Sequence, residues 1–213
     1  MSRRRSGVTA GLKRAVDLLG ASGGLVVLSP VLATACAAIV VTMGRPVLFR
    51  QRRPGRQGRP FTIYKFRTMS EPAPGQSRFH SDAHRVTAVG AILRKTSIDE
   101  LPELWNVLRG DMSLVGPRPL LMDYLPKYTA EQARRHEVRP GITGWAQVCG
   151  RQSIPFSRRL ALDVWYVDHH SLALDLQILV RTAWQAIRGV GQDTGQSLAD
   201  VDDLGFWTEG SGA

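Results

Sequence analysis

The chain has 213 residues, with 28 lysines and arginines against 18 acidic residues and a formal charge of +10. Its 43% hydrophobic and 22% charged residues are typical of a folded globular protein and exclude wholesale disorder. The two cysteines, Cys36 and Cys149, form no C-x-x-C pattern, so the sequence supports neither a disulfide framework nor a zinc site.

An apolar segment is the first element along the chain. Residues 18–43 form a run of 26 without a charge, which is long enough for a membrane segment. Five lysines and arginines precede this run, and eight follow it by position 67. Because basic flanks favour the cytoplasmic side of a membrane, the pattern predicts that both ends of the segment stay on that side.

A break is expected near the middle of this segment, at Ser29 and Pro30. Proline removes a backbone donor and clashes with the preceding helical turn, so it predicts a kink. The two halves then span about 18 and 21 Å, and each is shorter than a hydrocarbon core of about 30 Å. A re-entrant helix pair is one interpretation. The segment alone leaves open a straight but kinked transmembrane helix, a cleaved signal peptide and a buried helical hairpin of a soluble domain.

A short β-hairpin is predicted next. Residues 52–60 are basic and rich in turn formers, and residues 61–69 alternate between apolar and polar side chains. Residues 70–85 follow as an exposed loop. His80 and His84 lie four positions apart in this loop, but no third ligand is near them in sequence, so we expect solvated histidines rather than a metal pair.

Two helices are predicted after the loop, over residues 86–94 and 97–108. The second begins with a capping box formed by Ser97 and Glu100, which places Asp99 and Glu100 in its first turn. Both carboxylates can simply stabilise the start of this helix. The functional alternative is that Asp99 is a nucleophile, because the same helix end attracts a phosphorylated substrate.

The functional alternative also needs cations. Two carboxylates repel a pyrophosphate, so it implies a divalent cation, and Mg²⁺ is the expected cofactor. Lys65, Arg94 and Arg118 are the basic side chains that are candidates to neutralise the remaining charge.

Two loops rich in proline and glycine are expected to line the same pocket. In the first, Pro117 and Pro119 flank Arg118 and restrict its backbone, which suits bidentate recognition of a phosphate or a base edge. A rigid turn without a binding role fits this loop equally well. The second loop, residues 139–147, also contains proline and glycine residues that favour turns.

Four motifs occur in one order along the chain: Lys65–Met69, Leu93–Val107, Gly116–Pro119 and Arg139–Trp145. Together they resemble the bacterial sugar transferase family, the monotopic polyprenyl-phosphate phosphoglycosyl transferases, over about residues 10–189. In that family the apolar segment is a re-entrant helix pair with a Ser-Pro at its break, which Ser29 and Pro30 match. The resemblance therefore favours the re-entrant interpretation.

The resemblance also implies a reaction. Asp99 attacks the β-phosphate of a UDP-sugar, releases UMP and forms a covalent phosphosugar intermediate, which polyprenyl phosphate displaces in a ping-pong cycle. Glu100 holds Mg²⁺. The other substrate-binding positions that the resemblance implies are Lys65, Arg94, Pro117, Arg118, Pro119 and Asp163. The product enters glycoconjugate or exopolysaccharide assembly as its first membrane step.

The expected fold class is α+β. We predict one mostly helical, membrane-associated domain over residues 1–189, with a re-entrant helix pair at about 13–44 and a small β-hairpin. Further helices are predicted over residues 156–170 and 172–188, the last being either interfacial or core-facing. Residues 190–213 hold five acidic and no basic residues and form an acidic tail, which is either disordered or folded back on the basic body.

Two other functions compete with the transferase. A nucleic-acid-binding protein is suggested by the 28 basic and 13 acidic residues of positions 1–189, but no nucleic-acid fold pattern is present. A non-catalytic membrane adaptor is disfavoured by the presence of both Asp99 and Glu100. We therefore expect a UDP-sugar donor, a polyprenyl phosphate acceptor, lipid at the cytoplasmic face of a bacterial inner membrane, and no nucleic acid. The sugar, the pathway and the oligomeric state do not follow from the sequence.

Overall fold

The computed structural model describes residues 7–71, 85–150, 154–188 and 202–206. Within these ranges the chain is mostly helical and has two small sheets of two strands each, so the α+β class expected from the sequence is confirmed. Most of the predicted acidic tail lies outside the described residues, as do His80, His84 and most of the loop around them.

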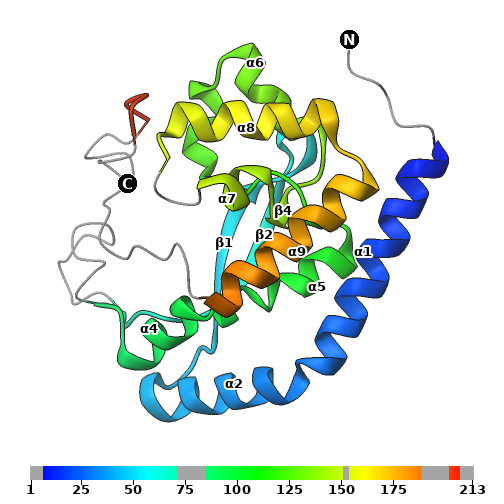
Figure 1. Cartoon of the computed structure of the whole chain (residues 1–213). Coiled ribbons are helices and arrows are strands. Elements are labelled where there is room, and N and C mark those ends of the chain that lie inside the picture. The colour runs from blue at the N-terminus through cyan, green and yellow to red at the C-terminus, as the bar shows by residue number, and fades with distance from the viewer. Residues whose placement is uncertain (1–6, 72–84, 151–153, 189–201, 207–213) are drawn as a thin grey trace.

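The predicted break in the apolar segment is present. Helix α1 (Gly7–Val27) and helix α2 (Ser29–Met43) are bent by 60° relative to each other and meet at a corner in Figure 1. The Ser29 hydroxyl donates a hydrogen bond of 2.8 Å to the carbonyl of Val26 across the break. In the part of the chain that the structure describes, no single helix has the length and apolar character of a membrane span, but this bent pair has both when taken together.

The predicted β-hairpin is confirmed. Strands β1 (Leu48–Pro54) and β2 (Pro60–Phe66) are antiparallel, with Leu48 opposite Phe66 and Pro54 opposite Pro60. A 3-10 turn, Arg56–Gly58, joins them. Residues 52–54, whose composition indicated a turn, belong to β1, because a strand with one exposed face accepts arginine side chains.

The next helix is close to its predicted position. Helix α4 (Ala88–Lys95) begins at Thr87, whose hydroxyl accepts a hydrogen bond of 3.0 Å from the amide of Gly90. Gly90 lies against strand-end backbone, since a Cβ at this position would stand only 1.9 Å from the carbonyl oxygen of Thr68. This close approach brings the N-terminal end of α4 beside the residues that follow β2.

The single helix predicted over residues 97–108 is wrong. Ser97 has a φ of 57° and makes no side-chain capping bond, so the predicted capping box does not form. A 3-10 turn (Ile98–Glu100) is followed by α5 (Glu103–Arg109), whose N-cap is Pro102. Proline cannot donate to the preceding turn, which separates the two pieces. Asp99 and Glu100 therefore lie in a turn before the helix, not in its first turn.

The remaining elements include one pair of strands that the sequence did not predict. Strands β3 (Ser113–Val115) and β4 (Gly141–Thr143) are parallel and too short to give a periodic signal. The predicted helices near residues 156–170 and 172–188 are confirmed as α8 (Phe156–His169) and α9 (Leu172–Arg188). The other helical pieces are a 3-10 turn at Met122–Lys127, α6 (Ala130–Ala133), a 3-10 turn at Arg134–Glu137 and α7 (Trp145–Gly150).

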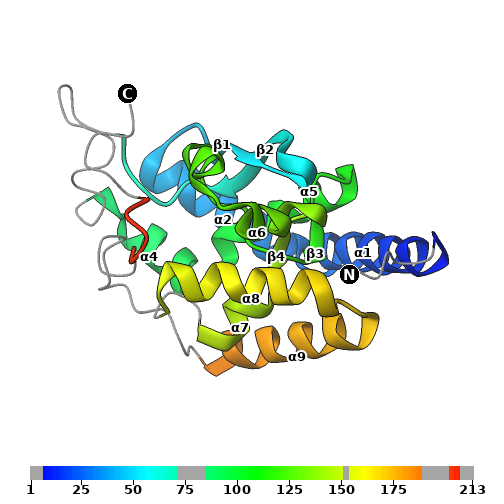
Figure 2. The same cartoon turned by 90° about the horizontal axis from the view of Figure 1, so that it is seen from above.

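The elements form layers around the short parallel strands. Figure 2 shows β3 and β4 between the β1–β2 hairpin on one side and helices α8 and α9 on the other. One apolar cluster joins α1, β2 and α5 through Ala21, Ile63 and Leu104. A second cluster joins α2 and α4 through Ile39 and Leu93. The β1–β2 hairpin, the 3-10 turn Ile98–Glu100 and α5 thus pack directly on the two N-terminal helices.

Polar contacts fix the first turns of α1 on this body. The buried carboxylate of Asp17 accepts hydrogen bonds from the Ser113 hydroxyl at 2.9 Å and from the Leu114 amide at 3.0 Å. Lys13 pairs with Asp175 of α9 at 2.8 Å. Because an unpaired buried polar group is costly, these bonds specify one docking register for an otherwise apolar helix.

We predict that replacing Asp17 by alanine destabilises the protein. The substitution leaves the Ser113 hydroxyl and the Leu114 amide without their acceptor, which costs about 1–3 kcal/mol. Thermal unfolding of detergent-solubilised protein measures the effect, with Asp123→Ala as the control because this carboxylate is exposed. Equal unfolding temperatures for the two variants would contradict the anchoring role of Asp17.

Candidate active site

The Glu100 carboxylate lies between two cations that come from distant parts of the chain. Lys65, on β2, places its Nζ 2.6 Å from Glu100 Oε1. Arg118, after β3, places Nη2 2.5 Å from Oε1 and Nη1 3.3 Å from Oε2. The structure therefore brings together three residues that the sequence predicted for the site.

These cations determine the protonation state of Glu100. Burial by itself raises the pKa of this carboxyl, but the charges of Arg118 and Lys65 and their hydrogen bonds outweigh burial, and the pKa lies below its usual range. The attraction is mutual, since Glu100 raises the pKa of Arg118. Glu100 is consequently a permanent anion that is held in place by two cations.

Asp99 has the opposite environment. Among the residues that the structure describes, none forms a hydrogen bond or an ion pair with its carboxylate, which is partly exposed. Burial and the neighbouring charge of Glu100 raise the pKa of Asp99 to about 6, while Lys65, Arg118 and Arg94 act in the other direction. At pH 7 the group is therefore mostly ionised but has its oxygens available, which is the condition that a nucleophile needs.

Arg94, the third cation that the sequence predicted for the site, lies in the last turn of α4. Its Nε donates a hydrogen bond of 2.9 Å to the Thr68 hydroxyl, and its charge acts on Asp99. The guanidinium is thus oriented by a side chain that follows β2. This position fits a cation that neutralises part of a bound phosphate.

Sequence reasoning missed a third carboxylate, Glu103. It is 1% exposed, and its Oε1 lies 3.1 Å from Lys65 Nζ without accepting a well-aligned hydrogen bond. Burial raises its pKa, against the attraction of Lys65. The available signal was its spacing, because Glu103 lies three residues after Glu100 and precedes the buried Leu104 on the same helix.

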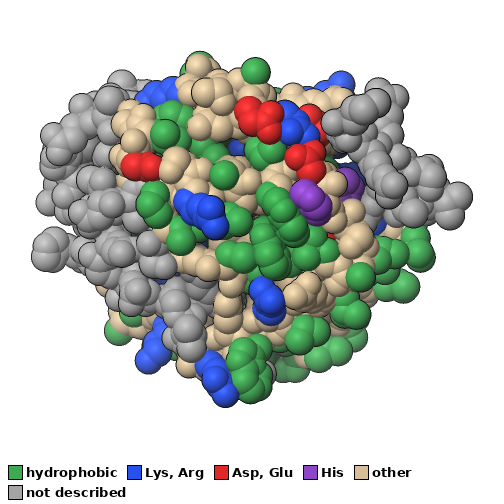
Figure 3. All heavy atoms as spheres, turned by 45° about the horizontal axis from the view of Figure 1, so that its top comes forward, with side chains coloured by type: hydrophobic (Ala, Val, Ile, Leu, Met, Phe, Trp, Pro, Cys, Tyr) green, Lys and Arg blue, Asp and Glu red, His purple; other side chains and the backbone are tan. Residues whose placement is uncertain are grey.

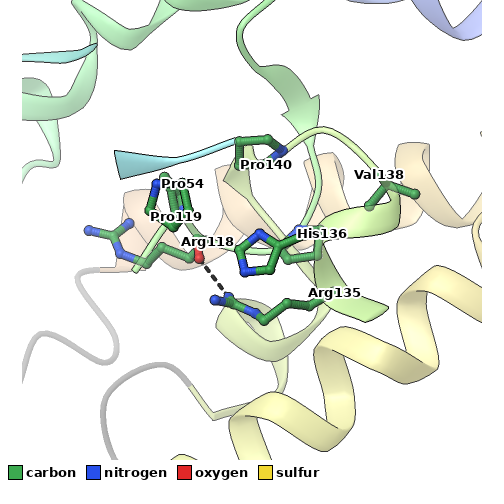
Figure 4. A pocket seen from close by; sticks show the side chains of 8 residues that line it. Pro54, Arg118, Pro119, Arg135, His136, Val138 and Pro140 are labelled. Carbon is green, nitrogen blue, oxygen red and sulfur yellow. Dashed lines mark hydrogen bonds between the residues drawn. The ribbon is translucent and has the colours of Figure 1, made fainter. Parts of the chain in front are cut away.

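The first predicted loop and Pro140 of the second line one hollow, but Asp99 and Glu100 are not among its lining residues, so a pocket shared by both loops and the carboxylates stays a prediction. Figure 4 shows this hollow between the prolines of the first loop, the end of β1 and the residues that precede β4. Its lining consists of Pro54, Pro117, Arg118, Pro119, Arg135, His136, Val138 and Pro140. The loops approach so closely because both crossing points are glycines: a Cβ on Gly141 would stand 2.1 Å from the Gly116 nitrogen.

Asp163 lies behind this hollow rather than at its surface. The carboxylate is 2% exposed and accepts hydrogen bonds of 2.7 and 3.1 Å from the buried Arg135. Arg135 in turn donates a bond of 2.7 Å to the carbonyl of Arg118, the dashed line in Figure 4. Asp163 thereby helps to position Arg118, and a direct contact with substrate stays a prediction.

Two more residues of this region were missed by sequence reasoning. Arg53 belongs to β1, and both burial and the charge of Arg118 lower its pKa to about 10. His136 lines the hollow, and burial and the charge of Arg135 lower its pKa to about 4, so that it is neutral at pH 7. Neither carried a motif, because their proximity to Arg118 arises only from the tertiary fold.

The donor atoms fit Mg²⁺ when a phosphorylated substrate completes the site. No group of three or more metal-binding side chains occurs within the described residues. Mg²⁺ is commonly held by one or two carboxylates together with substrate phosphates. Asp99 has no bonded partner within the described residues, and Glu100 Oε2 accepts only one hydrogen bond, from Arg118, so both carboxylates retain acceptor capacity. Glu100 therefore fits the role of metal ligand that the sequence predicted.

Comparison with known proteins identifies a family. Residues 8–189 match the family model described as bacterial sugar transferase. The chain is 51% identical over 190 residues to an uncharacterized sugar transferase, EpsL, of Bacillus subtilis, covering 89% of this chain and 94% of that one.

Two further relatives have more specific names. A UDP-glucose:undecaprenyl-phosphate glucose-1-phosphate transferase of Caulobacter vibrioides is 45% identical over 180 residues, which cover 80% of this chain and 67% of the relative. An exopolysaccharide production protein, ExoY, of Rhizobium meliloti is 39% identical over 187 residues, which cover 80% and 83% of the two chains.

We predict that Asp163→Asn is far more destabilising than Asp168→Asn, although both residues lie on α8. Asp163 neutralises the buried Arg135, and an uncompensated buried guanidinium costs about 3 kcal/mol or more. Asp168 pairs with Arg134 at the surface, where an ion pair contributes about 0–1 kcal/mol. Unfolding in denaturant or by heat measures both. Similar small losses would show that Arg135 does not depend on this carboxylate.

Proposed function

This chain belongs to the bacterial sugar transferase family, and from its site we propose that it transfers a sugar phosphate from a UDP-sugar to undecaprenyl phosphate and releases UMP. The observation that carries the proposal is the pair of adjacent carboxylates with opposite environments, Asp99 without a bonded partner in the described residues and Glu100 held by Lys65 and Arg118. The printed name of the Caulobacter relative supports the choice of donor and acceptor.

The proposed reaction has two displacements at phosphorus. An Asp99 oxygen attacks the β-phosphorus of the UDP-sugar, the bond to the α-phosphate oxygen breaks, and UMP leaves. Asp99 then carries the phosphosugar as an acyl phosphate. An oxygen of undecaprenyl phosphate attacks the same phosphorus, the bond to Asp99 breaks, and the carboxylate is regenerated with an undecaprenyl diphosphosugar as product.

The basic residues bind and orient the anionic substrate in this scheme. Lys65 and Arg94 contact the diphosphate, and Arg118, held between Pro117 and Pro119, lies near the nucleotide. Mg²⁺ supplies charge neutralisation and polarisation of the phosphoryl oxygens when bound. Glu100, with Asp99 beside it, is the ligand that we propose for this ion, because carboxylate oxygens are its preferred donors.

We further propose that α1 and α2 form a re-entrant membrane pair with both ends at the cytoplasmic face. The most exposed apolar side chains of the pair are Leu19, Val26, Val27 and Val41, which are 73–83% exposed. Basic residues flank the pair on both sides. A uridine nucleotide from water and a polyprenyl phosphate from the bilayer then meet at the headgroup level, where Asp99 would act.

Helix α9 fits an interfacial position in the same arrangement. Leu176, Val180 and Trp184 form an exposed apolar stripe at four-residue spacing. Arg188 lies over the Trp184 ring with its Cζ 4.0 Å from the centroid, as expected for an aromatic and a cation that share a membrane interface. Figure 3 shows hydrophobic side chains in several groups on one face of the molecule, with lysine and arginine side chains between them. The product would enter exopolysaccharide assembly, consistent with the name of the Rhizobium relative.

We predict that purified protein releases UMP from at least one UDP-sugar in the presence of Mg²⁺ and undecaprenyl phosphate. Asp99→Asn should lower this rate by at least about 10³-fold, because the amide is not a competent nucleophile. Asp123→Asn is the matched control, and its rate should stay within about twofold because this carboxylate is exposed.

The covalent step has its own readout. Donor without acceptor should leave one phosphosugar on the wild-type chain, detected by intact mass and located to Asp99 by peptide mapping. Retention of full activity by Asp99→Asn would reject Asp99 as the nucleophile. A folded wild type that releases no UMP from any UDP-sugar of a full panel would reject the proposed donor.

Membrane topology gives a separate prediction. In a background with Cys36→Ser and Cys149→Ser, single cysteines are introduced by Gly11→Cys and Arg45→Cys, on opposite sides of the apolar segment, with Asp123→Cys as a marker of the catalytic body. An impermeant maleimide should label none of the three in intact spheroplasts and all three after permeabilisation. Labelling of only one of the two flanking cysteines in intact spheroplasts would demonstrate a membrane-spanning helix instead.

A further inference from the structure

A short segment beyond the family match returns to the catalytic body. Residues 202–206 lie outside the matched range 8–189, yet Phe206 is only 7% exposed. Its ring centroid lies 5.7 Å from each of the rings of Tyr124, Tyr128 and Phe156. These three rings and Phe206 form what we call the aromatic cluster, and Phe206 is its only member from outside the family range among the described residues.

Polar contacts hold the segment in place. Asp203 accepts a hydrogen bond of 2.9 Å from the Ser157 amide and a second one from the Ser157 hydroxyl, at the start of α8. Lys127 donates to the carbonyl of Phe206. Between them Gly205 adopts a φ of +64°, which returns the chain so that the Phe206 ring enters the cluster. The docking is thus specified by side chains and backbone together.

The aromatic cluster is connected to the active site by one chain of contacts. The Tyr128 hydroxyl accepts a hydrogen bond of 3.1 Å from Arg135 Nη1, and the Arg135 guanidinium also lies over the Tyr128 ring, 5.7 Å from its centroid. Arg135 Nη2 donates to the carbonyl of Arg118 at 2.7 Å. Arg118 in turn binds Glu100. Phe206 therefore ends a contact chain that begins at the catalytic carboxylates.

We propose that Asp202–Phe206 is part of the active-site architecture, and that Phe206 positions Arg118 by packing against Tyr128 and thereby fixing Arg135. Phe206 touches no reacting atom in this arrangement and is a positioning residue. The proposal rests on the proposed function insofar as Arg118 binds the donor. Its physical basis is the rigidity of Tyr128, whose ring loses one neighbour and gains rotational freedom when Phe206 is absent.

The expected defect is local. The apolar cluster that joins α1, β2 and α5 contains no residue of the aromatic cluster, so the core around Asp99 and Glu100 keeps its packing without Phe206. Small displacements of a substrate-orienting group have large kinetic effects. Loss of Phe206 should therefore weaken binding of the donor while the protein keeps most of its folding stability.

The test compares Phe206→Ala with Phe206→Leu in the full chain. Hydrogen–deuterium exchange should increase in Phe206→Ala over residues 116–136, which include Arg118, Tyr128 and Arg135, but not in α5. The KM for the UDP-sugar should rise by about tenfold with kcat changed less than about threefold. Phe206→Leu retains an apolar side chain and should stay within about threefold of wild type in both constants.

The outcomes separate this proposal from the proposed function. Unchanged exchange over residues 116–136 in Phe206→Ala would overturn the positioning role, whatever the enzyme's substrate. Increased exchange in Phe206→Ala with an unchanged KM would also overturn the positioning role. A lower unfolding temperature of this variant, with a fall in kcat and no change in KM, would overturn it as well. Absence of turnover by the wild type would reject the proposed function, and the exchange comparison would still decide whether Phe206 fixes Arg118. Asp203→Ala, which removes the hydrogen bonds between this segment and Ser157, should also increase exchange over residues 116–136.

Discussion

The carboxylate of Glu100 is the point on which the arrangement of the site depends. Lys65 comes from the hairpin and Arg118 from the loop after β3, and both converge on this one side chain. Two cations brought this close repel each other unless an anion lies between them. Glu100 therefore holds the hairpin and the arginine loop together, and the turn that carries it also presents Asp99.

The two adjacent carboxylates, Asp99 and Glu100, have different surroundings, and these suit them to different roles. Glu100 is ionised because Arg118 and Lys65 surround it, whereas Asp99 has a raised pKa and no bonded partner within the described residues. A pair of neighbouring acids with pKa values pushed apart is the usual arrangement where one group reacts and the other binds charge. Position in the sequence does not distinguish them, since either could face the substrate. The contacts of Glu100 make it the poorer nucleophile, because it already accepts two hydrogen bonds at Oε1 and one at Oε2 from cations, whereas Asp99 accepts none within the described residues.

Elements with a strong local signal were predictable, and the site was predictable only in part. The break at Pro30, the hairpin and helices α8 and α9 follow from proline, alternation and helical periodicity. The capping box failed because Glu100 has stronger partners in the tertiary structure than the amide of Ser97, which no local pattern reveals. Strands β3 and β4 are too short for periodicity, and the roles of Glu103, Arg53 and Phe206 arise from contacts between distant segments. Motif matching found Asp163 but not its partner, Arg135.

The position of the Ile98–Glu100 turn relative to the apolar helices depends on the polar residues of α1. Its charged residues Lys13, Arg14 and Asp17 all bond to the body, to α9, α5 and β3 respectively, and residues 18–27 carry no charge. Such bonds are directional, so they fix the rotation of the helix about its axis as well as its position, which apolar contacts alone do not. The turn that carries Asp99 packs on β2 and α4, and these pack on α1 and α2. The position of Asp99 relative to the apolar pair is thus set by rigid contacts, and the reaction that we propose, between a lipid-linked phosphate and a nucleotide from water, requires that property.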